Sequence, residues 1–496
     1  MSKNSELILA IDQGTTSSRV IAYNLQGEEI RSASRPLPIY YPQDGWVEQK
    51  PAEVWSSVSE SLEELVSGID LESVLGVAVT NQRETVLAWN PETGETLSPA
   101  IVWQCRRSKD ICARWKEEGR EVEIKRKTGL VVDAYFSGSK ILWMLENISG
   151  LKEKEINGEV VFGTMDSWVV YKLSQRLERD AVVTEPSNAS RTMLFDINQG
   201  DWDQELLDAV GVSSSSMARV LKSDGDFPKA KIKGKEIPVL AILGDQQASL
   251  KGLSCDQAGQ AKCTFGTGAF LLVNEGERVA APGAGLLSTV AWQAGAGKSV
   301  YATEGSVFMA GALVQWLRDS LGIVKNAEET ETLAAEVEDS AGVVVVPAFT
   351  GLGAPHWDPD ARGLIAGLTR DSNSKHIVRA SLEAVAFQVK DLLAAFPSSV
   401  STIKVDGGMS RNKLFCQMLA DICQIPVEIS PRVEATAFGA ARLAAERLEH
   451  DVSPRGFSLF SGEKSQTLVP SEVSEGLRKS SELWERAVER AKGWSG

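Results

Sequence analysis

Apolar and polar positions along the chain fall into two kinds of segment. Short runs rich in Val, Ile and Leu predict β-strands at 7–12, 18–24, 75–80, 85–89, 238–243, 261–265, 269–273, 343–348 and 402–405. Longer segments with apolar residues three or four positions apart predict helices at 53–68, 138–148, 306–321, 376–396, 411–423, 434–448 and 475–493. Strands mixed with helices of this length are typical of the α/β class.

One short pattern occurs twice. Residues 12–17, DQGTTS, stand between two strand-like runs near the start of the chain, and residues 265–268, FGTG, stand between two more near its middle. Each unit predicts a hairpin whose tip carries Gly and Thr. The repetition indicates two domains of related fold with a boundary near residue 250. We therefore expect an N-terminal domain over 1–250 and a C-terminal domain over 251–496.

The composition is that of an ordinary globular protein, because 43% of the 496 residues are hydrophobic and 24% are charged. A formal net charge of −15 argues against general binding to nucleic acid or to anionic membranes. The spacing of the six Cys residues fits neither a zinc site nor a disulfide framework. The apolar runs are too short for an export signal or a membrane span. We expect a cytoplasmic protein without membrane insertion, which holds any anionic ligand with local groups.

The first hairpin tip, DQGTTSSR at 12–19, combines one carboxylate, one glycine, four hydroxyls and one cation. Gly14 permits a tight backbone path along which successive N–H groups converge on an anion. Asp12 does not bind phosphate directly, but a carboxylate can hold Mg²⁺ or its waters, and Mg²⁺ commonly bridges a carboxylate to a nucleotide. Taken alone, the segment is equally consistent with a polar surface hairpin and with a phosphate-binding loop.

Two further segments are candidates for nucleotide contacts. FGTG places Thr267 between two glycines, where its N–H and hydroxyl are available to phosphate, although Gly-Thr-Gly alone is more often a turn. IKVDGGMSRN at 403–412 predicts a strand that ends in a Gly pair, and ligands of α/β proteins favour that end of a strand. Gly408 and Asn412 are the candidates for lining a nucleoside site there. The alternative is a plain turn with Ser410 as the N-cap of the next helix.

Carboxylates also follow two predicted strands. Asp245, in LAILGDQQ, is placed to accept a proton from a substrate hydroxyl. Arg83 and Glu84, in VTNQRETV, offer donors and acceptors together, which suits a polyol. The alternatives are a helix cap at Asp245 and a surface ion pair at Arg83 and Glu84.

Two other candidate sites are rejected. The segment WQAGAGKSV at 292–300 contains Gly-Lys-Ser, but a P-loop needs Gly where this chain has Trp292, so we expect a hairpin turn. His356, His376 and His450 lie outside all the loops above, so catalysis by histidine is not expected.

Together, the segments resemble the FGGY family of carbohydrate kinases, within the actin/hexokinase-like superfamily, over about residues 6–450. The resemblance is carried by DQGTTSSR, YPQDGWVEQ, TNQRET, IVWQCRR, SNASRTMLFDI, GDQQASL, FGTGAFLLVN, EGSVFMAGALVQWLRD, GLGAPHWDPDARGLIAGLTR and VDGGMSRN. It implies two ribonuclease-H-like domains with a cleft between them. It also implies transfer of the γ-phosphoryl group of ATP to a primary hydroxyl, and the pattern is most similar to members that phosphorylate glycerol to sn-glycerol 3-phosphate.

The resemblance implies roles for individual residues. Asp245 is implied as the general base, with Asp12 near Mg²⁺. The implied glycerol-binding residues are Arg83, Glu84, Trp103, Tyr135, Asp245, Gln246 and Phe270, and Trp103 and Phe270 among them form an apolar wall. The implied phosphate- and nucleotide-binding residues are Thr15, Thr16, Ser17, Arg19, Thr267, Gly311, Gln315, Gly408 and Asn412. The expected partners are glycerol and ATP, and the expected assembly is a homodimer or homotetramer.

Two departures from the family pattern concern regulation. Many bacterial relatives bind fructose 1,6-bisphosphate with a Gly-Gly-Lys-Gly loop followed by Arg. Here the stretch KAKIKGKEIPVL at 229–240 lacks the Gly pair and has Glu236 where Arg is expected, so we expect weak or absent inhibition. Some relatives are activated by phosphorylation of a His in this region, which has no His here. The alternative functions are an FGGY kinase for another polyol or sugar and a catalytically inactive nucleotide-binding protein.

Overall fold

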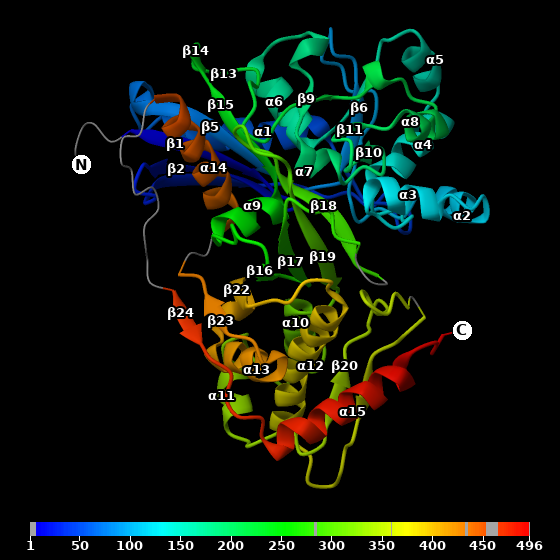
Figure 1. Cartoon of the computed structure of the whole chain (residues 1–496), viewed down its shortest axis with the longest axis vertical. Helices are drawn as coiled ribbons and strands as arrows, with labels where there is room; N and C mark the ends of the chain where they lie inside the picture. Colours follow the sequence, from blue (N-terminus) through cyan, green and yellow to red (C-terminus); the bar gives the residue numbers. More distant parts are fainter. Residues whose placement is uncertain (1–5, 282–284, 359, 432–434, 453–464, 496) are drawn as a thin grey trace.

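The computed structural model describes residues 6–281, 285–358, 360–431, 435–452 and 465–495. Two large sheets, each with helices packed on it, lie one above the other in Figure 1. This two-domain arrangement confirms the predicted α/β class. All nine predicted strands are present, from β1 to β22.

The first sheet has the order β15(Val239–Gly244), β5(Val74–Asn81), β1(Leu7–Gln13), β2(Ser17–Asn24), β3(Glu29–Pro36). The strands β15, β5 and β1 are parallel, and β2 and β3 complete an antiparallel edge. Side chains alternate between its two faces: Leu9 and Ile11 pack with α1(Pro51–Val66), while Ile8 and Ala10 pack with α14(Ala435–Val452). Burial on both faces explains why β1 is almost continuously apolar.

The second sheet has the order β18(Leu287–Trp292), β19(Val300–Val307), β17(Ala269–Gly276), β16(Gln260–Phe265), β22(Thr402–Gly407), β23(Val427–Ile429), β24(Gln466–Leu468). Along β16, Ala261, Cys263 and Phe265 pack into the core formed with α12(Ser374–Ala395) and α13(Lys413–Cys423). The alternate positions, Lys262 and Thr264, therefore face the opposite side of this sheet.

A smaller sheet, with the order β4(Glu48–Gln49), β7(Ala100–Ile101), β6(Val86–Trp89), β8(Val161–Thr164), extends the first half of the molecule. Further strands are β9(Val183–Thr184), β10(Phe195–Asp196), β11(Asp201–Trp202), β12(Arg219–Val220), β13(Ala230–Ile232), β14(Lys235–Ile237), β20(Val344–Val346) and β21(Leu364–Ala366). Further helices are α2(Lys109–Glu117), α3(Glu121–Thr128), α4(Ser137–Asn147), α5(Leu151–Ile156), α6(Met165–Ser174), α7(Pro186–Ala189), α8(Gln204–Val210), α9(Asp245–Gly252), α10(Gly311–Asp319), α11(Glu329–Ala335) and α15(Glu475–Ala491).

The bounds of two predicted helices differ from those in the structure. The helix predicted over 306–321 begins only at Gly311, because Ser306 and Val307 complete β19. The helix predicted over 434–448 corresponds to α14, and residue 434 itself lies outside the described residues. The Gly-Lys-Ser segment forms the connection between β18 and β19, so the predicted hairpin is confirmed.

The helix α14 follows residue 250 in the chain but packs on the first sheet, beside β1 and β5 (Figure 1). It crosses α9 at two glycines with almost no space between the backbones. A Cβ atom added at Gly439 would lie 1.8 Å from the carbonyl oxygen of Ala248, and one at Gly252 would lie 1.9 Å from that of Ala435. The position of α9, and of the residues at its start, therefore depends on α14.

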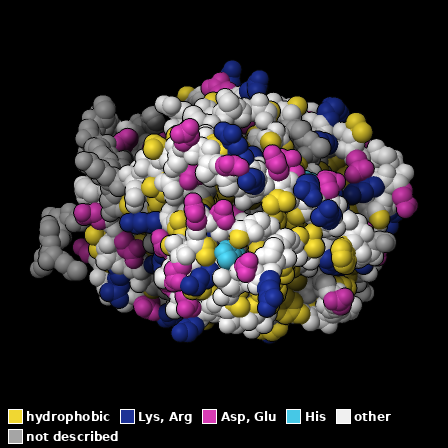
Figure 2. All heavy atoms as spheres, turned by 90° about the horizontal axis from the view of Figure 1, so that it is seen from below, with side chains coloured by type: hydrophobic (Ala, Val, Ile, Leu, Met, Phe, Trp, Pro, Cys, Tyr) yellow, Lys and Arg dark blue, Asp and Glu magenta, His cyan; other side chains and the backbone are white. Residues whose placement is uncertain are grey.

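The surface carries both signs of charge. Figure 2 shows Lys and Arg side chains interspersed with Asp and Glu on the face seen from below the second sheet. Within the part of the chain that the structure describes, no helix combines the length and apolar character needed to cross a membrane.

Candidate active site

Three of the motifs singled out in the sequence meet at one edge of the first sheet. The strands β1, β5 and β15 are parallel, and their last residues are paired: Gln13 with Asn81, and Asn81 with Gly244. The loop DQGTTSSR, the pair Arg83-Glu84 and the carboxylate of Asp245 follow these strand ends directly. Carboxyl ends of parallel strands are where α/β proteins bind ligands, so this edge is the candidate site.

The other two motifs meet in the same way on the second sheet. The strands β16 and β22 are parallel, and Phe265 pairs with Gly407 at their carboxyl ends. Gly407 has φ +88°, and a Cβ atom there would lie 2.3 Å from the carbonyl oxygen of Phe265. A residue with a side chain does not fit at this position, which explains the first glycine of the pair. The loops FGTG and DGG therefore emerge side by side.

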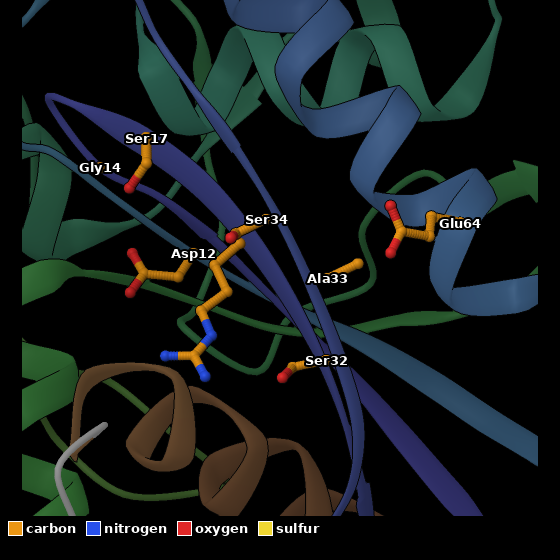
Figure 3. Close-up of a pocket in the computed structure, with 8 residues that line it drawn as sticks. Asp12, Gly14, Ser17, Ser32, Ala33, Ser34 and Glu64 are labelled. Atoms are coloured by element: carbon orange, nitrogen blue, oxygen red, sulfur yellow. The ribbon is translucent and has the colours of Figure 1, made fainter.

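The tip of the first hairpin is a tight turn closed by a hydrogen bond of 2.9 Å from the N–H of Gly14 to the carbonyl oxygen of Ser17. Thr16 and Ser17 are exposed, whereas Thr15 is half-buried. Asp12, Gly14, Ser17 and Arg19 line an open hollow of about 520 Å³. Figure 3 shows Asp12 and Ser17 at one side of this hollow, with Glu64 of α1 at the other. The tip thus offers hydroxyl groups beside a space large enough for a phosphate chain.

The surroundings of Asp12 fit the way in which Mg²⁺ binds. No group of three or more His, Cys, Asp or Glu side chains among the described residues is arranged to hold a metal by itself. Mg²⁺ commonly keeps several waters and uses only one or two carboxylates together with substrate phosphates. Asp12, a half-buried carboxylate that borders an open polar hollow, is a group of the kind that such a site uses.

The second hairpin tip packs against the start of α10. The N–H groups of Ala310 and Ala312 donate to the carbonyl oxygen of Thr267 at 2.9 and 3.0 Å. The N–H of Gly311 donates to the carbonyl oxygen of Gly266 at 3.0 Å. These bonds bring Thr267 and Gly311 together, and Gln315 is exposed one helical turn further along α10.

Asn412, and not Ser410, is the N-cap of α13. The side-chain oxygen of Asn412 accepts a hydrogen bond of 2.8 Å from the N–H of Phe415. The hydroxyl of Ser410 instead donates to the carbonyl oxygen of Gly407 at 2.7 Å. The cap alternative was therefore right in kind but placed at the wrong residue. Gly408 stays exposed beside it, with open space where a Cβ atom would be.

Arg83 lies at the centre of a buried cluster of charges. Its guanidinium meets both carboxylate oxygens of Glu304 at 2.6 and 3.0 Å, and its Nε lies 3.2 Å from Oδ1 of Asp245. Arg191 binds the same Glu304 at 3.1 Å and Oε1 of Glu84 at 2.6 Å. Arg83 and Glu84 thus form part of an internal network, so the surface ion pair is wrong as an alternative for these two residues.

The cluster shifts the pKa values of several of its members. Burial alone would raise the pKa of Glu304, but the charges of Arg191 and Arg83 lower it to about 2. Burial raises the pKa of Glu84 despite the same two guanidinium groups, and burial also raises that of the Tyr135 hydroxyl. Glu84 has φ +60°, an uncommon backbone conformation of the kind found at functional sites.

Aromatic rings form one side of this site. The rings of Trp103 and Tyr135 meet edge to face with their centroids 5.6 Å apart. The indole N–H of Trp103 donates to Oγ1 of Thr15 at 3.0 Å, so this wall is joined directly to the first hairpin tip. Phe270 lies on β17, opposite Thr264 of β16, and is half-buried.

Three buried charged residues that the sequence does not predict contact the residues predicted for the acceptor site. The sequence predicts no role for Arg191, Glu304 or Lys262, although they lie in SNASRTMLFDI, in EGSVFMAG and in the run before FGTG. The signal available in the sequence was a charged residue inside an apolar segment, as at Lys262 in AKCTF and Glu304 in YATEG. Such a residue needs a buried partner.

Comparison with known families places this geometry in context. The model described as "FGGY family of carbohydrate kinases, N-terminal domain" matches residues 7–252, and the corresponding C-terminal domain matches residues 261–447. The chain is 44% identical to a glycerol kinase of Alkalilimnicola ehrlichii, with 99% of both chains covered. It is 48% identical to a glycerol kinase of Shewanella frigidimarina, with 88% of both covered.

Solved structures show the same fold. A glycerol kinase of Plasmodium falciparum, determined with ADP, superposes with a TM-score of 0.91 at 32% identity and covers 98% of both chains. A gluconate kinase of Lactobacillus acidophilus superposes with a TM-score of 0.84 at 20% identity and likewise covers 98% of both. The second likeness concerns the fold alone.

Proposed function

The chain belongs to the FGGY family of carbohydrate kinases, and we propose that it transfers the γ-phosphoryl group of ATP to a primary hydroxyl of glycerol. The products are sn-glycerol 3-phosphate and ADP. The observation that carries this proposal is the position of Asp245, held 3.2 Å from Arg83 at the sheet edge where the first hairpin tip also lies. The names of its full-length relatives support glycerol as the acceptor.

The proposed acceptor site combines polar groups with aromatic rings. We assign hydroxyl binding to Arg83, Glu84, Tyr135, Asp245 and Gln246, and contact with the carbon chain to Trp103 and Phe270. A three-carbon triol presents hydroxyls to several of these groups at once and has little apolar surface. Because both carboxylate oxygens of Glu304 accept hydrogen bonds from Arg83, the guanidinium is held in place before the acceptor arrives.

The phosphate chain lies between the two hairpin tips in this proposal. Asp12 would hold Mg²⁺, which when bound neutralises charge on the nucleotide phosphates. The phosphate-binding residues are Thr15, Thr16, Ser17, Arg19 and Thr267, and the nucleotide-binding residues are Gly311, Gln315, Gly408 and Asn412. Their support is the pairing of strand ends that brings FGTG beside DGG and packs it on α10.

The chemical step requires positioning and charge stabilisation more than covalent catalysis. Asp245 accepts the proton of the attacking hydroxyl, whose oxygen then bonds to the γ-phosphorus while the bond to the β-phosphate oxygen breaks. About one third of the Asp245 side chain is exposed (33%), so the carboxylate is accessible to a substrate. Exclusion of water by the two halves of the molecule prevents transfer to water instead of glycerol.

Three further predictions stay untested. One is the division into domains at residue 250. This boundary assigns α14 to the C-terminal domain, although α14 packs on the first sheet. A homodimer or homotetramer is another. The third is a cytoplasmic location.

The test is an assay of the purified protein with ATP and a panel of polyols and sugars, including glycerol, erythritol, xylulose and gluconate. We expect glycerol to be the preferred acceptor by kcat/KM. Equal or faster turnover of xylulose or erythritol would support the alternative of another FGGY kinase. Binding of ATP with no transfer to any acceptor would support an inactive nucleotide-binding protein.

A further inference from the structure

Lys262 is a completely buried lysine near the site to which the proposed function gives no task. It lies on β16, on the side of the second sheet that faces α9. Its exposed fraction is 0%, and its ammonium group donates to Oε1 of Gln246 and, at 2.9 Å, to Oγ1 of Thr264. Both contacts are to neutral oxygens, which is an uncommon arrangement for a buried charge.

Two carboxylates that do not contact Lys262 directly stabilise the charge of its ammonium group. Burial lowers the pKa of Lys262, and the negative charges of Asp406 and Asp245 act in the opposite direction. Asp406 pairs with Thr264 across β16 and β22, and Asp245 begins α9 immediately before Gln246. The ammonium therefore lies between the acceptor end of the site and the strand that leads to the nucleotide turn.

Thr264, the second partner of Lys262, is itself fixed. Its hydroxyl lies 3.2 Å from the hydroxyl of Ser249, and that of Ser249 lies 3.3 Å from Oδ2 of Asp406. Ser249 follows Asp245 by one turn of α9, so both residues face β16 from the same side of the helix. These contacts hold the ammonium in one position relative to α9.

An ammonium group has only donors, so the amide atom of Gln246 that faces Lys262 has to be the oxygen. The amide oxygen is thereby occupied, and the two N–H donors of Gln246 are left for other partners. Next to it, the carboxylate of Asp245 has only acceptors. A substrate hydroxyl is both donor and acceptor, so it matches this pair. It can donate its O–H to the carboxylate of Asp245 and accept a hydrogen bond from an amide N–H of Gln246.

We propose that Lys262 is a positioning residue, whose ammonium fixes the side-chain amide of Gln246 so that its N–H donors meet the acceptor hydroxyl beside Asp245. This inference rests on the proposed function and specifies how the N–H donors of Gln246 are directed towards the acceptor hydroxyl. Without the ammonium, the amide turns freely and presents oxygen as often as nitrogen.

The first experiment measures steady-state kinetics of Lys262→Met, which keeps an unbranched side chain one atom shorter and removes the ammonium donors. We expect kcat/KM for glycerol to fall about tenfold or more, the effect of losing one well-placed hydrogen bond, mainly through KM. The KM for ATP should change less than about twofold, within the scatter of a variant that leaves the nucleotide contacts intact. Lys404 of β22 pairs with Lys262 in the sheet and donates to the carbonyl oxygen of Ser254, so Lys404→Met is the matched control and should behave as wild type.

The second experiment is a double-mutant cycle with Gln246→Met. If Lys262 acts through the amide, the double variant is no worse than Gln246→Met alone, whereas independent roles make the two losses multiply. Multiplied losses, or an unchanged KM for glycerol in Lys262→Met, would overturn the proposal. Should Lys262→Met fail to fold, Gln246→Glu decides: it still accepts from Lys262 but lacks N–H donors, so a normal KM for glycerol in this variant contradicts the proposal.

The two proposals fail in different ways. A wild-type protein that does not phosphorylate glycerol refutes the proposed function. A wild-type protein that does so, together with a Lys262→Met variant of normal KM, refutes only the role of Lys262.

Discussion

Asp245 occupies the first position of α9, where its direction is set by the helix and by Nε of Arg83 at 3.2 Å. Replacing it with Asn keeps the shape but removes the proton acceptor. For Asp245→Asn we expect kcat to fall about 10²-fold or more, the usual contribution of a general base, while ATP binding is retained. Steady-state kinetics and calorimetric titration with ATP measure the two effects.

The matched control for this variant is Asp110→Asn, because Asp110 is an exposed residue in the first turn of another helix, α2. It should leave kcat unchanged. Near-normal turnover of Asp245→Asn would remove Asp245 from the role of base.

Ionisation of Glu304 makes the free energy of unfolding depend on pH. Its pKa is about 2 in the folded protein, below its ordinary value of 4.5, so its contribution to stability is fully present above pH 4.5. That contribution is lost as the pH falls from 4.5 towards 2, because in this range the unfolded state binds a proton that the folded state does not. For Glu304→Gln we expect a loss of about 3–5 kcal/mol in the free energy of unfolding at pH 7, since two buried guanidinium groups lose their shared carboxylate.

The difference between Glu304→Gln and wild type should shrink as the pH is lowered from 4.5 to 3, and urea unfolding at several pH values measures it. The exposed Glu92 provides the control variant Glu92→Gln, for which no comparable change is expected. A difference that stays constant with pH would contradict the depressed pKa.

The sequence was sufficient for some of these residues and insufficient for others. Arg83, Glu84 and Asp245 each follow a predicted strand, so their position at a sheet edge was predictable from local pattern. The partnership of Arg83 with Glu304 joins residues 221 positions apart, and it depends on the register of β19 in another sheet. The hydrophobic pattern of a single segment does not show how a strand is aligned with strands of another sheet. The charge cluster is therefore seen only in the structure.

The crossing of α9 and α14 is the element on which the site depends most. A methyl group at Gly439 overlaps the backbone of α9 at Ala248 and Gly252, which a rotamer change does not relieve. For Gly439→Ala we expect a loss of at least about 2 kcal/mol in stability, because the helices have to separate. We also expect kcat to fall, since α9 carries Asp245. Chemical unfolding and steady-state kinetics measure the two effects.

Gly476→Ala is the control for this prediction. Gly476 lies in the first turn of α15, where the atom nearest to an added methyl group would be Oδ2 of the movable Asp339 side chain, at 3.1 Å. Alanine there should be neutral or slightly stabilising. If Gly439→Ala is equally harmless, the helices have more freedom than their contact indicates.

Helix boundaries at this scale were less predictable than strands. The apolar spacing of 306–321 continues without interruption from β19 into α10, so the periodicity does not show where the strand ends. The strands that lead to the site are short, β-branched and bounded by polar turns, which makes them recognisable without tertiary information.

Across the whole molecule, the two sheets share a hydrophobic core. Leu272 and Trp292 of the second sheet belong to the same buried cluster as Ile8 and Ala10 of the first, and Phe438 of α14 lies among them. A fragment of residues 1–252 therefore lacks the cover for one face of its sheet. We expect this fragment to aggregate or to bind a hydrophobic dye, and to show no cooperative thermal unfolding by circular dichroism.

The full chain, unfolded under the same conditions, is the control and should lose its structure cooperatively. A monomeric 1–252 fragment with a sharp unfolding transition would show that the first sheet does not need α14.

The hydrogen bond from Trp103 to Thr15 limits how this enzyme can be redesigned. Enlarging the acceptor site for longer sugars by shortening Trp103 also releases a hydroxyl of the proposed phosphate loop. Variants of Trp103 selected for a broader range of acceptors are expected to hydrolyse more ATP without transfer to an acceptor. A library directed at Phe270, which lies on β17, leaves that hydrogen bond intact. A change of acceptor range is thus expected to increase ATP hydrolysis when it is made at Trp103 but not when it is made at Phe270.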